Sequence, residues 1–459
     1  MKTRLQIALA IVIVLTMSSS AYPSGFAIIE QSVRGLGNSF SGGSAVCEDA
    51  STIFFNPAGI ARLEGHDAVA GLHIVMLSAE FENKGSTHIL QPLTDVPLLG
   101  GNGGNGGVTG YIPNFYYSYS GYKGWSFGVG VNAPFALSTK YEDRTWVGRY
   151  HALETTLMSV NINPTVAYSI PYDMVHRFSI GVGVDAQYMD ATLSNAIDFG
   201  TLDASGAFSP IPAGFFGLTP QRDDGFSELK GNSWAWGFNL GVLVEFTERT
   251  RAGIAYRSQI KHDVEGTATF QTPDTLQVVK DATGAFTDCD VTASVKFPDN
   301  LSVSAYHDIS DQWAISGDVT WTHWSVFEEL RFKFANGQPD GVTTENWKDA
   351  WRFALGWTYR PTDEWTARAG VAYDATPIPD EQHRTPRIPG NDRYWVSVGG
   401  GYQVNDRFRA DVAYAHLFIS QPKIDKSRFT LAEDEIRGGL RGEYDASVDI
   451  LSLQVSVQF

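Results

Sequence analysis

The sequence predicts an all-β fold, a transmembrane antiparallel β-barrel of about 14 strands with an N-terminal hatch in its lumen. Two observations support this prediction. Runs of alternating apolar and polar residues recur along most of the chain, and the last run ends on an aromatic residue at the C-terminus. The connections between these runs are short and long in turn. Bacterial outer-membrane barrels combine such runs with short periplasmic turns, long outer loops and an even strand number.

The C-terminal segment is the clearest single strand. Its apolar face carries Leu451, Leu453, Val455, Val457 and Phe459. Its opposite face carries Ser452, Gln454, Ser456 and Gln458. The first face suits lipid, the second tolerates water, and the terminal aromatic ring suits the membrane interface. We therefore expect this segment to be the last transmembrane strand.

The N-terminus has the pattern of a secretory signal. Lys2 and Arg4 precede an apolar run from Leu5 to Met17, and small residues continue to Ala21. This order predicts a signal peptide over 1–21 with cleavage after Ala21. No later apolar run reaches the length of about 18 residues that a spanning helix needs. The mature chain is therefore expected in the bacterial outer membrane.

The alternating runs give the expected strand order. Turn residues bound each run, and each run is long enough to cross a bilayer when it is tilted. The runs occupy 66–81, 110–120, 123–138, 154–170, 177–195, 232–246, 251–266, 288–307, 312–334, 345–360, 364–375, 392–403, 407–421 and 444–459. We assign 66–459 to the barrel on this basis.

The side chains of the predicted strands divide into two sets. In the run 351–359 one face carries Trp351, Phe353, Leu355, Trp357 and Tyr359. Only lipid suits such a surface. By the same alternation, charged side chains face the interior at Arg257, Arg368, Asp374, Arg409 and Asp411. Inside a barrel these charges pair with one another or meet water.

Composition and charge limit the function classes. The formal net charge of −17 argues against a nucleic-acid partner. Only Cys47 and Cys289 are present, and the sequence leaves open whether they form a disulfide. The histidines lack the close paired spacing of a metal site, so neither a metal nor a cofactor is predicted. We expect a monomer in contact with outer-membrane lipid and lipopolysaccharide.

Residues 22–65 do not alternate like a strand. They are rich in Gly, Ser and Ala, and the turn sequence Asn56-Pro57-Ala58 lies near their end. A barrel of about fourteen strands encloses a lumen too wide for its own side chains to fill. We therefore predict that 22–65 form a compact hatch that blocks the lumen.

A series of short motifs follows a fixed order along the chain. The series comprises Gly25-Phe26, Gly35-Leu36-Gly37, Ser41-Gly42, Asp49-Ala50, Asn56-Pro57-Ala58, Trp324-Ser325-Val326-Phe327, Lys348-Asp349-Ala350-Trp351-Arg352, Tyr373-Asp374-Ala375-Thr376-Pro377-Ile378-Pro379-Asp380 and Asp392-Arg393-Tyr394-Trp395. In these motifs, and over essentially its whole mature length, the chain resembles the outer-membrane transporters of long-chain fatty acids and hydrocarbons, the FadL/TodX type. The resemblance implies passive uptake of long-chain fatty acids or other hydrophobic compounds, which are caught in the upper lumen and released sideways at a kinked third strand.

The resemblance also implies ligand-binding residues. Phe26 matches the phenylalanine that lies beside the ligand, and Arg331 matches one of two basic residues for a carboxylate. The second basic position falls near Asn195, which favours a ligand without an acid group. Arg331 has the same parity as lipid-facing residues, so it points inward only if a bulge near His323 shifts the register.

The kink of the third strand is expected at Asn132, Pro134 and Phe135. Proline lacks the N–H group that a strand donates to its neighbour, so Pro134 would open the sheet locally. Such an opening is the physical requirement for a lateral exit.

Two alternatives remain, a barrel enzyme of the lipase or protease type and a general porin. Gly124-Trp125-Ser126-Phe127-Gly128 matches the G-x-S-x-G pattern of hydrolases, but it lies inside a predicted strand with no helix after it. A porin needs an open polar lumen, which the predicted hatch would block. We expect a transporter without catalytic residues.

Overall fold

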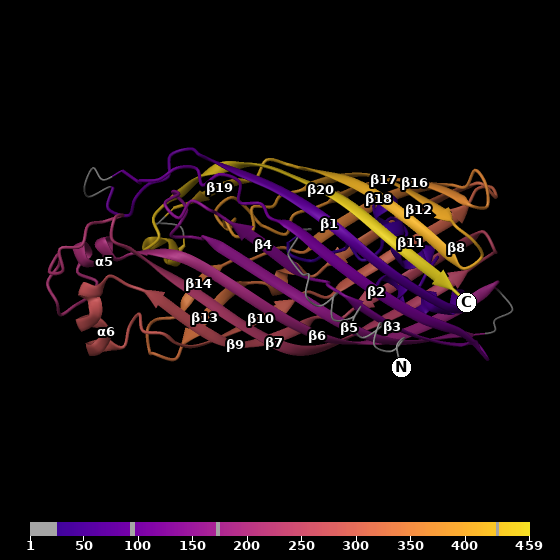
Figure 1. The fold of residues 1–459 in the computed structure, drawn as a ribbon, viewed down its shortest axis with the longest axis horizontal. Coiled ribbons are helices and arrows are strands. Elements are labelled where there is room, and N and C mark those ends of the chain that lie inside the picture. The colour runs from indigo at the N-terminus through magenta and orange to yellow at the C-terminus, as the bar shows by residue number, and fades with distance from the viewer. Residues whose placement is uncertain (1–24, 92–96, 171–174, 428–430) are drawn as a thin grey trace.

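The computed structural model describes residues 25–91, 97–170, 175–427 and 431–459. The predicted signal peptide lies outside this part of the chain. Among the described residues, no helix is both long and apolar enough to cross a membrane. The strands form one antiparallel sheet that closes on itself as a long barrel (Figure 1).

The wall contains 14 barrel strands, as the sequence predicts. Some are single segments: β1 (Gly65–Asn83), β2 (Thr109–Tyr122), β5 (Glu154–Ile170), β6 (Arg177–Asp198), β7 (Asp224–Glu245), β16 (Trp365–Asp374), β17 (Arg393–Gln403) and β20 (Leu440–Gln458). The others are split in two: β3 (Trp125–Asn132) with β4 (Ala136–Lys140), β8 (Thr250–Arg257) with β9 (Ile260–Gln271), β10 (Cys289–Phe297) with β11 (Asn300–Asp308), β12 (Trp313–Thr322) with β13 (Glu329–Phe334), β14 (Gly341–Thr344) with β15 (Ala350–Tyr359), and β18 (Phe408–Ile419) with β19 (Lys423–Lys426). The barrel closes where β1 pairs with β20, from Asp67 opposite Gln458 to Asn83 opposite Gly442.

Burial alternates along the wall as the sequence predicts. Trp351 and Phe353 are each 48% exposed, whereas Arg352 between them is 6% exposed. Apolar side chains therefore face lipid and polar side chains face the lumen. Exposed aromatic residues gather near the short turns at Trp125, Trp313, Trp365, Tyr402 and Phe408, and farther along the wall at Trp234, Trp236, Trp351, Tyr394 and Phe418.

The two ends of the barrel differ. One end carries the short turns and the C-terminus, while long loops with α5 (Phe199–Ser205), η2 (Asp274–Leu276), α6 (Gln277–Thr283) and η4 (Ala432–Glu435) extend the other end (Figure 1). Long loops mark the outer end of a bacterial barrel, so the short turns lie on the periplasmic side.

Several strands that were expected to be continuous are interrupted. The run 288–307 divides at Pro298 and Asp299, between β10 and β11. The run 312–334 divides around η3 (Trp324–Val326). Proline cannot donate to a ladder, which accounts for the first break. The second break turns Trp324 into the lumen, where its side chain is fully buried.

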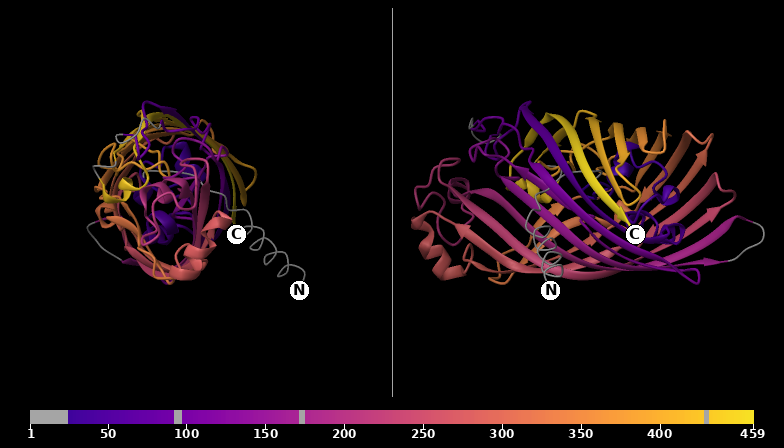
Figure 2. Two further views of the ribbon diagram at one scale, coloured as in Figure 1. Left: turned by 90° about the vertical axis from the view of Figure 1, so that its left-hand side faces the viewer. Right: turned by 45° about the vertical axis from the view of Figure 1, so that its right-hand side comes forward.

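The N-terminal segment folds inside the barrel as the predicted hatch (Figure 2). Its helices are α2 (Val33–Gly37), α3 (Gly43–Val46), α4 (Thr52–Phe55) and η1 (Pro57–Arg62). Side chains cap two of them, because Ser32 Oγ accepts a hydrogen bond from the Gly35 amide and Asn56 Oδ1 accepts one from the Ala58 amide. The hatch lies toward the periplasmic end, which leaves the outer half of the lumen for cavities (Figure 2).

Candidate functional site

The outer half of the barrel contains an apolar cavity, here called the upper cavity. Its apolar lining includes Phe26, Leu157, Met189, Val264, Val295 and Leu330. Glu345 and Arg387 are the two charged residues among those that line it. A lining of this polarity suits a ligand with a long apolar body and one polar end.

Phe26 lies at the centre of an aromatic cage formed with Phe135, Phe297, Trp324, Phe327 and Trp347. The ring centroid of Phe26 lies 6.0, 5.5, 4.8, 5.4 and 5.8 Å from those five rings, in that order. Only glycine fits at position 25, where the backbone enters the cage. The φ of Gly25 is +65°, and a Cβ atom there would lie 2.6 Å from the rings of Trp324 and Trp347. The cage therefore holds Phe26 in one place.

A second cavity, the lower cavity, lies on the other side of the cage. Phe135 and Trp324 of the cage line it, whereas Phe26 and Phe327 line the upper cavity. The lower cavity is more polar, since its lining includes Arg257, Asp318, Arg352 and Asp374. The aromatic cage thus separates an apolar cavity from a mixed one.

The third barrel strand is broken at 133–135, where the kink was predicted. On one side, β2 pairs with β3 as far as Phe115 opposite Val131, and pairing returns only at the bridge between Gly107 and Thr139. Within the described chain, residues 108–114 and 132–138 make no ladder pair with each other. On the other side, Ser159 Oγ donates to the Phe135 carbonyl over 2.8 Å and accepts from its amide over 2.9 Å. Over this stretch the third strand therefore lacks ladder partners in β2 and is held toward β5.

The hatch supplies backbone partners to this broken strand from inside the barrel. Ala27 forms a bridge with Phe135, the Ile28 amide donates to the Pro134 carbonyl over 2.7 Å, and the Ala136 amide donates to the Phe26 carbonyl over 3.0 Å. Gln31 Nε2 donates to the Ala133 carbonyl over 2.8 Å. Because Phe26 lies within this short ladder, the aromatic cage and the kink share one backbone connection.

The predicted turn at Asn56, Pro57 and Ala58 fixes the hatch to the wall. Asn56 is fully buried, and its Nδ2 donates to the Ser44 carbonyl over 2.7 Å and to the Val242 carbonyl of β7 over 3.0 Å. The turn lies against three glycines of the wall, Gly181, Gly241 and Gly253. A Cβ atom at any of these positions would collide with the turn or with Ser44 of the hatch.

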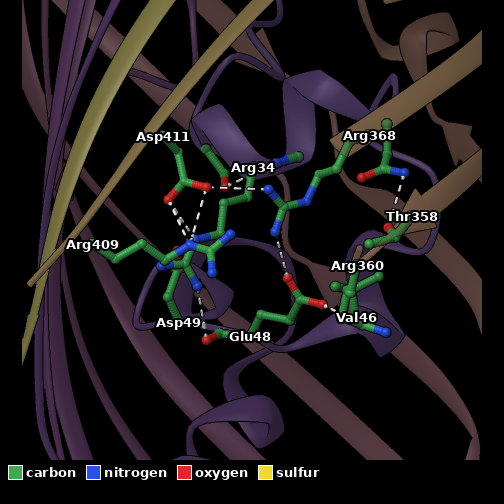
Figure 3. A network of polar contacts seen from close by, with 12 residues as sticks. Arg34, Val46, Glu48, Asp49, Thr358, Arg360, Arg368, Arg409 and Asp411 are labelled. Atoms are coloured by element: carbon green, nitrogen blue, oxygen red, sulfur yellow. Dashed lines mark hydrogen bonds and ion pairs between the residues drawn. The ribbon is translucent and has the colours of Figure 1, made fainter. Parts of the chain in front are cut away.

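Ion pairs join the hatch to the opposite part of the wall (Figure 3). Arg34 of the hatch lies 3.0 Å from Asp411, which also pairs with Arg368 over 3.1 Å. Glu48 of the hatch accepts from Arg368 over 3.0 Å and from Arg360 over 3.4 Å. Burial alone would raise the pKa of Glu48, but Arg368, Arg360 and Arg34 outweigh burial and hold that pKa well below its usual range.

The structure does not bring Arg331 to Phe26. Its guanidinium pairs with Glu329 over 2.6 Å and with Asp340 over 3.1 Å, and its side chain is 39% exposed. Its neighbours Leu330 and Phe332 line the upper cavity instead. Odd-numbered residues face outward in β12, and they still face outward in β13 after the break at η3. The register shift that would turn Arg331 inward therefore does not occur.

Sequence reasoning missed Arg387 and Glu345. Arg387 lies in the long connection between β16 and β17, and Glu345 lies between β14 and β15. Arg387 belongs to no predicted run, so no periodicity indicates which way its side chain points. Glu345 opens the predicted run 345–360, but β15 begins only at Ala350 and leaves Glu345 outside the strand. The two cysteines are both free, with Cys47 buried in the hatch and Cys289 at the start of β10.

Comparison with known proteins places the chain in a family. Residues 14–459 match the model of the outer membrane protein transport protein family (OMPP1/FadL/TodX). The long-chain fatty acid transport protein of Salmonella typhi is 30% identical over 435 residues, which cover 93% of this chain and 94% of the relative. The protein of the same name from Escherichia coli K12 is 29% identical, with 92% and 94% covered.

Solved structures agree on the fold. A Pseudomonas aeruginosa FadL homologue superposes with a TM-score of 0.82 at 24% identity, covering 95% of this chain and all of the other. The Pseudomonas putida toluene transporter TodX superposes with a TM-score of 0.66 at 17% identity, covering 96% and 99%. The chain therefore belongs to the OMPP1/FadL/TodX family, and it is a transport protein of the outer membrane and not an enzyme.

Proposed function

We propose that the protein admits long-chain fatty acids, or hydrocarbons of similar shape, by passive diffusion along the two cavities and out through the side of the barrel. The relatives named above carry these substrates in their own names, and the upper cavity offers an apolar space next to Phe26. The hatch occupies the lumen toward its periplasmic end, which argues for this path over the general-porin alternative.

The path begins at the outer loops. Phe215, which follows α5, is 67% exposed, and Val278 of α6 is 53% exposed. Exposed apolar side chains at the outer end provide a first contact for a hydrophobic compound. From there the compound would enter the upper cavity, pass the aromatic cage when Phe26 moves, and reach the lower cavity beside Pro134.

The break between β2 and the third strand is the observation that carries the proposed exit. Pro134 and Phe135 line the lower cavity and lie on the unpaired stretch of wall. In the present state the hatch covers this stretch through Ile28 and Phe26. Release of those few hydrogen bonds would connect the lower cavity to the membrane lipid without unfolding the barrel.

Restoring the third strand tests the proposal. Replacing 132–136 by alternating Val and Thr should rebuild a continuous ladder with β2, because β-branched residues favour strands and the proline is removed. Uptake of a radiolabelled fatty acid should then fall while binding at the outer surface persists. A matched control carries Thr at the lipid-facing positions Ala369 and Val371 of β16, and it should transport normally. Undiminished uptake by a variant whose wall is shown to be closed would refute lateral release.

A further inference from the structure

The hatch is attached to two opposite sides of the barrel. Residues 26–28 bond to the third barrel strand through the short ladder described above. The end of α2 is held on the other side, where Asn38 Nδ2 donates to the Trp357 carbonyl of β15 over 2.8 Å. β15 belongs to the tenth of the 14 barrel strands, which lies directly across the lumen from the third. Residues 29–32 therefore cross the lumen between the two attachments.

Glu30 lies in this crossing segment, and its carboxylate is buried without a partner. The residue is 1% exposed. Neither Oε1 nor Oε2 has a hydrogen-bond partner, and no cation of the described chain lies within ion-pair distance of them. A buried carboxylate that makes no hydrogen bond or ion pair is costly. The docked hatch thus holds Glu30 in a place that does not satisfy its side chain.

Two arginines on the far wall have unused donor groups. Arg352 of β15 and Arg393 of β17 are 6% and 3% exposed, and Nε and Nη1 of each have no hydrogen-bond partner among the described residues. Asp374 of β16 lies opposite both arginines in the strand register. One carboxylate between two guanidinium groups leaves this row with a positive charge. Arg393 and Arg352 are also the cations that attract Glu30 most strongly.

We propose that Glu30 is a positioning residue of the exit. Once the ladder on the third strand is released, its carboxylate pairs with Arg393 or Arg352 and holds residues 26–31 away from Pro134. This inference rests on the proposed function, since it requires that ladder to open. Attraction to the far wall pulls the crossing segment away from the exit, because the arginines and the third strand lie on opposite sides of the lumen. The charge-assisted bond of such a pair offsets the loss of the ladder.

The lower cavity provides the space for this movement. Ala27, Ile28 and Ile29 line it on the side of the crossing segment, and Arg352 and Asp374 line it from the far wall. The segment can therefore approach the arginines without any change in the wall. A compound that enters the lower cavity meets the same segment on its way to the third strand.

The first experiment removes the charge of Glu30 and follows hydrogen exchange by mass spectrometry in the full-length barrel in lipid nanodiscs. Glu30→Gln has the same shape without the charge, so the hatch should leave the third strand less often. Exchange in peptides that cover 25–31 and 132–137 should slow about 10-fold. Glu30→Asp keeps the charge and should exchange at a rate closer to that of the wild type. Glu64→Gln is the matched control, because Glu64 is exposed at the end of the hatch, and it should behave as the wild type.

The arginines separate pairing from a simple relief of burial, since Glu30→Gln would slow exchange for either reason. If the released hatch depends on pairing, Arg352→Gln combined with Arg393→Gln should also slow exchange, and adding Glu30→Gln should change little. If burial alone matters, removal of the arginines takes away the attraction on Glu30, and faster exchange would overturn the inference. Arg393→Gln alone should slow exchange by a smaller factor, which keeps the test decisive if the double variant does not fold. An unfolded hatch cannot imitate this result, because loss of structure speeds exchange.

Uptake of radiolabelled hexadecane distinguishes this inference from the proposed function. Uptake by cells that carry Glu30→Gln should fall, while binding at the outer surface persists. If exchange in Glu30→Gln is as fast as in the wild type, the inference fails and the proposed function stands. If exchange slows but uptake does not change, the pairing stands and lateral release at the third strand fails.

Discussion

The amide of Ile28 donates a 2.7 Å hydrogen bond to the carbonyl of Pro134, although the two residues belong to the hatch and to the barrel wall. Proline breaks the third strand, and the hatch then provides the partner that β2 does not. The same short ladder holds Phe26 in the aromatic cage. A movement of the first described residues of the hatch would therefore change the cage and the wall together.

Removing the side chain of Gln31 should loosen this ladder. Gln31 Nε2 donates to the Ala133 carbonyl, and no other side chain of the hatch reaches that carbonyl in the described structure. Gln31→Ala should speed hydrogen exchange in peptides that cover 25–31 and 132–137, as measured by mass spectrometry. Gln277→Ala is the control, since that side chain is exposed on α6 and donates to Asp281 of the same helix. Unchanged exchange in both peptides would mean that the ladder does not depend on Gln31.

Truncating Phe26 should weaken every hydrophobic ligand by a similar factor. The lost apolar contact is worth about 2 kcal/mol, or about 30-fold in affinity, and it does not depend on the head group. Titrations of Phe26→Ala with hexadecanoic acid and with hexadecane measure the two losses. Phe353→Ala, which alters only the lipid-facing surface, is the control. A loss confined to one ligand would place Phe26 at the head group and not beside the chain.

A side chain at Gly241 should displace the Asn56 turn. Gly241→Val places a Cβ against Asn56 Oδ1, so the hatch has to move away from β7. Cys47 reports this movement, because it is 3% exposed and its sulfur accepts a hydrogen bond from Thr52. In a Cys289→Ser background, maleimide should label Cys47 faster in Gly241→Val than in Gly400→Val, whose Cβ would come no closer than 4.0 Å to the Thr366 carbonyl. Equal labelling rates would show that the turn tolerates the substitution.

Neutralising Glu48 should make the barrel leak. Glu48→Gln removes the negative charge and one of the two oxygens that hold Arg360 and Arg368 to the hatch, so conductance in planar bilayers and entry of small hydrophilic antibiotics should rise. Glu64→Gln is the control, because Glu64 is exposed at the end of the hatch. If the Glu48→Gln variant excludes antibiotics as the wild type does, Glu48 does not anchor the hatch.

The same carboxylate gives a pH dependence with a defined sign. The docked hatch lowers the pKa of Glu48, so its pairing stabilises the docked state above the usual carboxyl range and is lost as pH falls below that range. Wild-type conductance should stay low from neutral pH down to about pH 4 and rise in stronger acid. Glu48→Gln should conduct at a raised level throughout.

The alternation of apolar and polar residues made the barrel wall predictable, but it did not predict which residues line the cavities. The apolar side chains of Trp351 and Phe353 face lipid and the charged side chain of Arg352 faces the lumen. The local sequence alone therefore predicts the orientation of each side chain. Proline chemistry likewise placed the kink at Pro134. The position of Arg387 depends on how a long loop folds back over β4 and β5, and no local pattern encodes that path. Arg331 was misplaced for a related reason, because the break at η3 preserves parity where a bulge would have changed it.

The two strands on either side of the unpaired stretch keep one register, and this bears on how the barrel is built. Phe115 faces Val131 on one side of the gap and Gly107 faces Thr139 on the other, and both pairs belong to the same alignment of the two strands. An unchanged alignment means an unchanged shear, and shear with strand number fixes the tilt and diameter of a barrel. The unpaired stretch is thus a local loss of pairing between two strands, and the rest of the cylinder does not have to adjust to it. Such a cylinder can close its seam between β1 and β20 in the same geometry whether the proposed exit is open or shut.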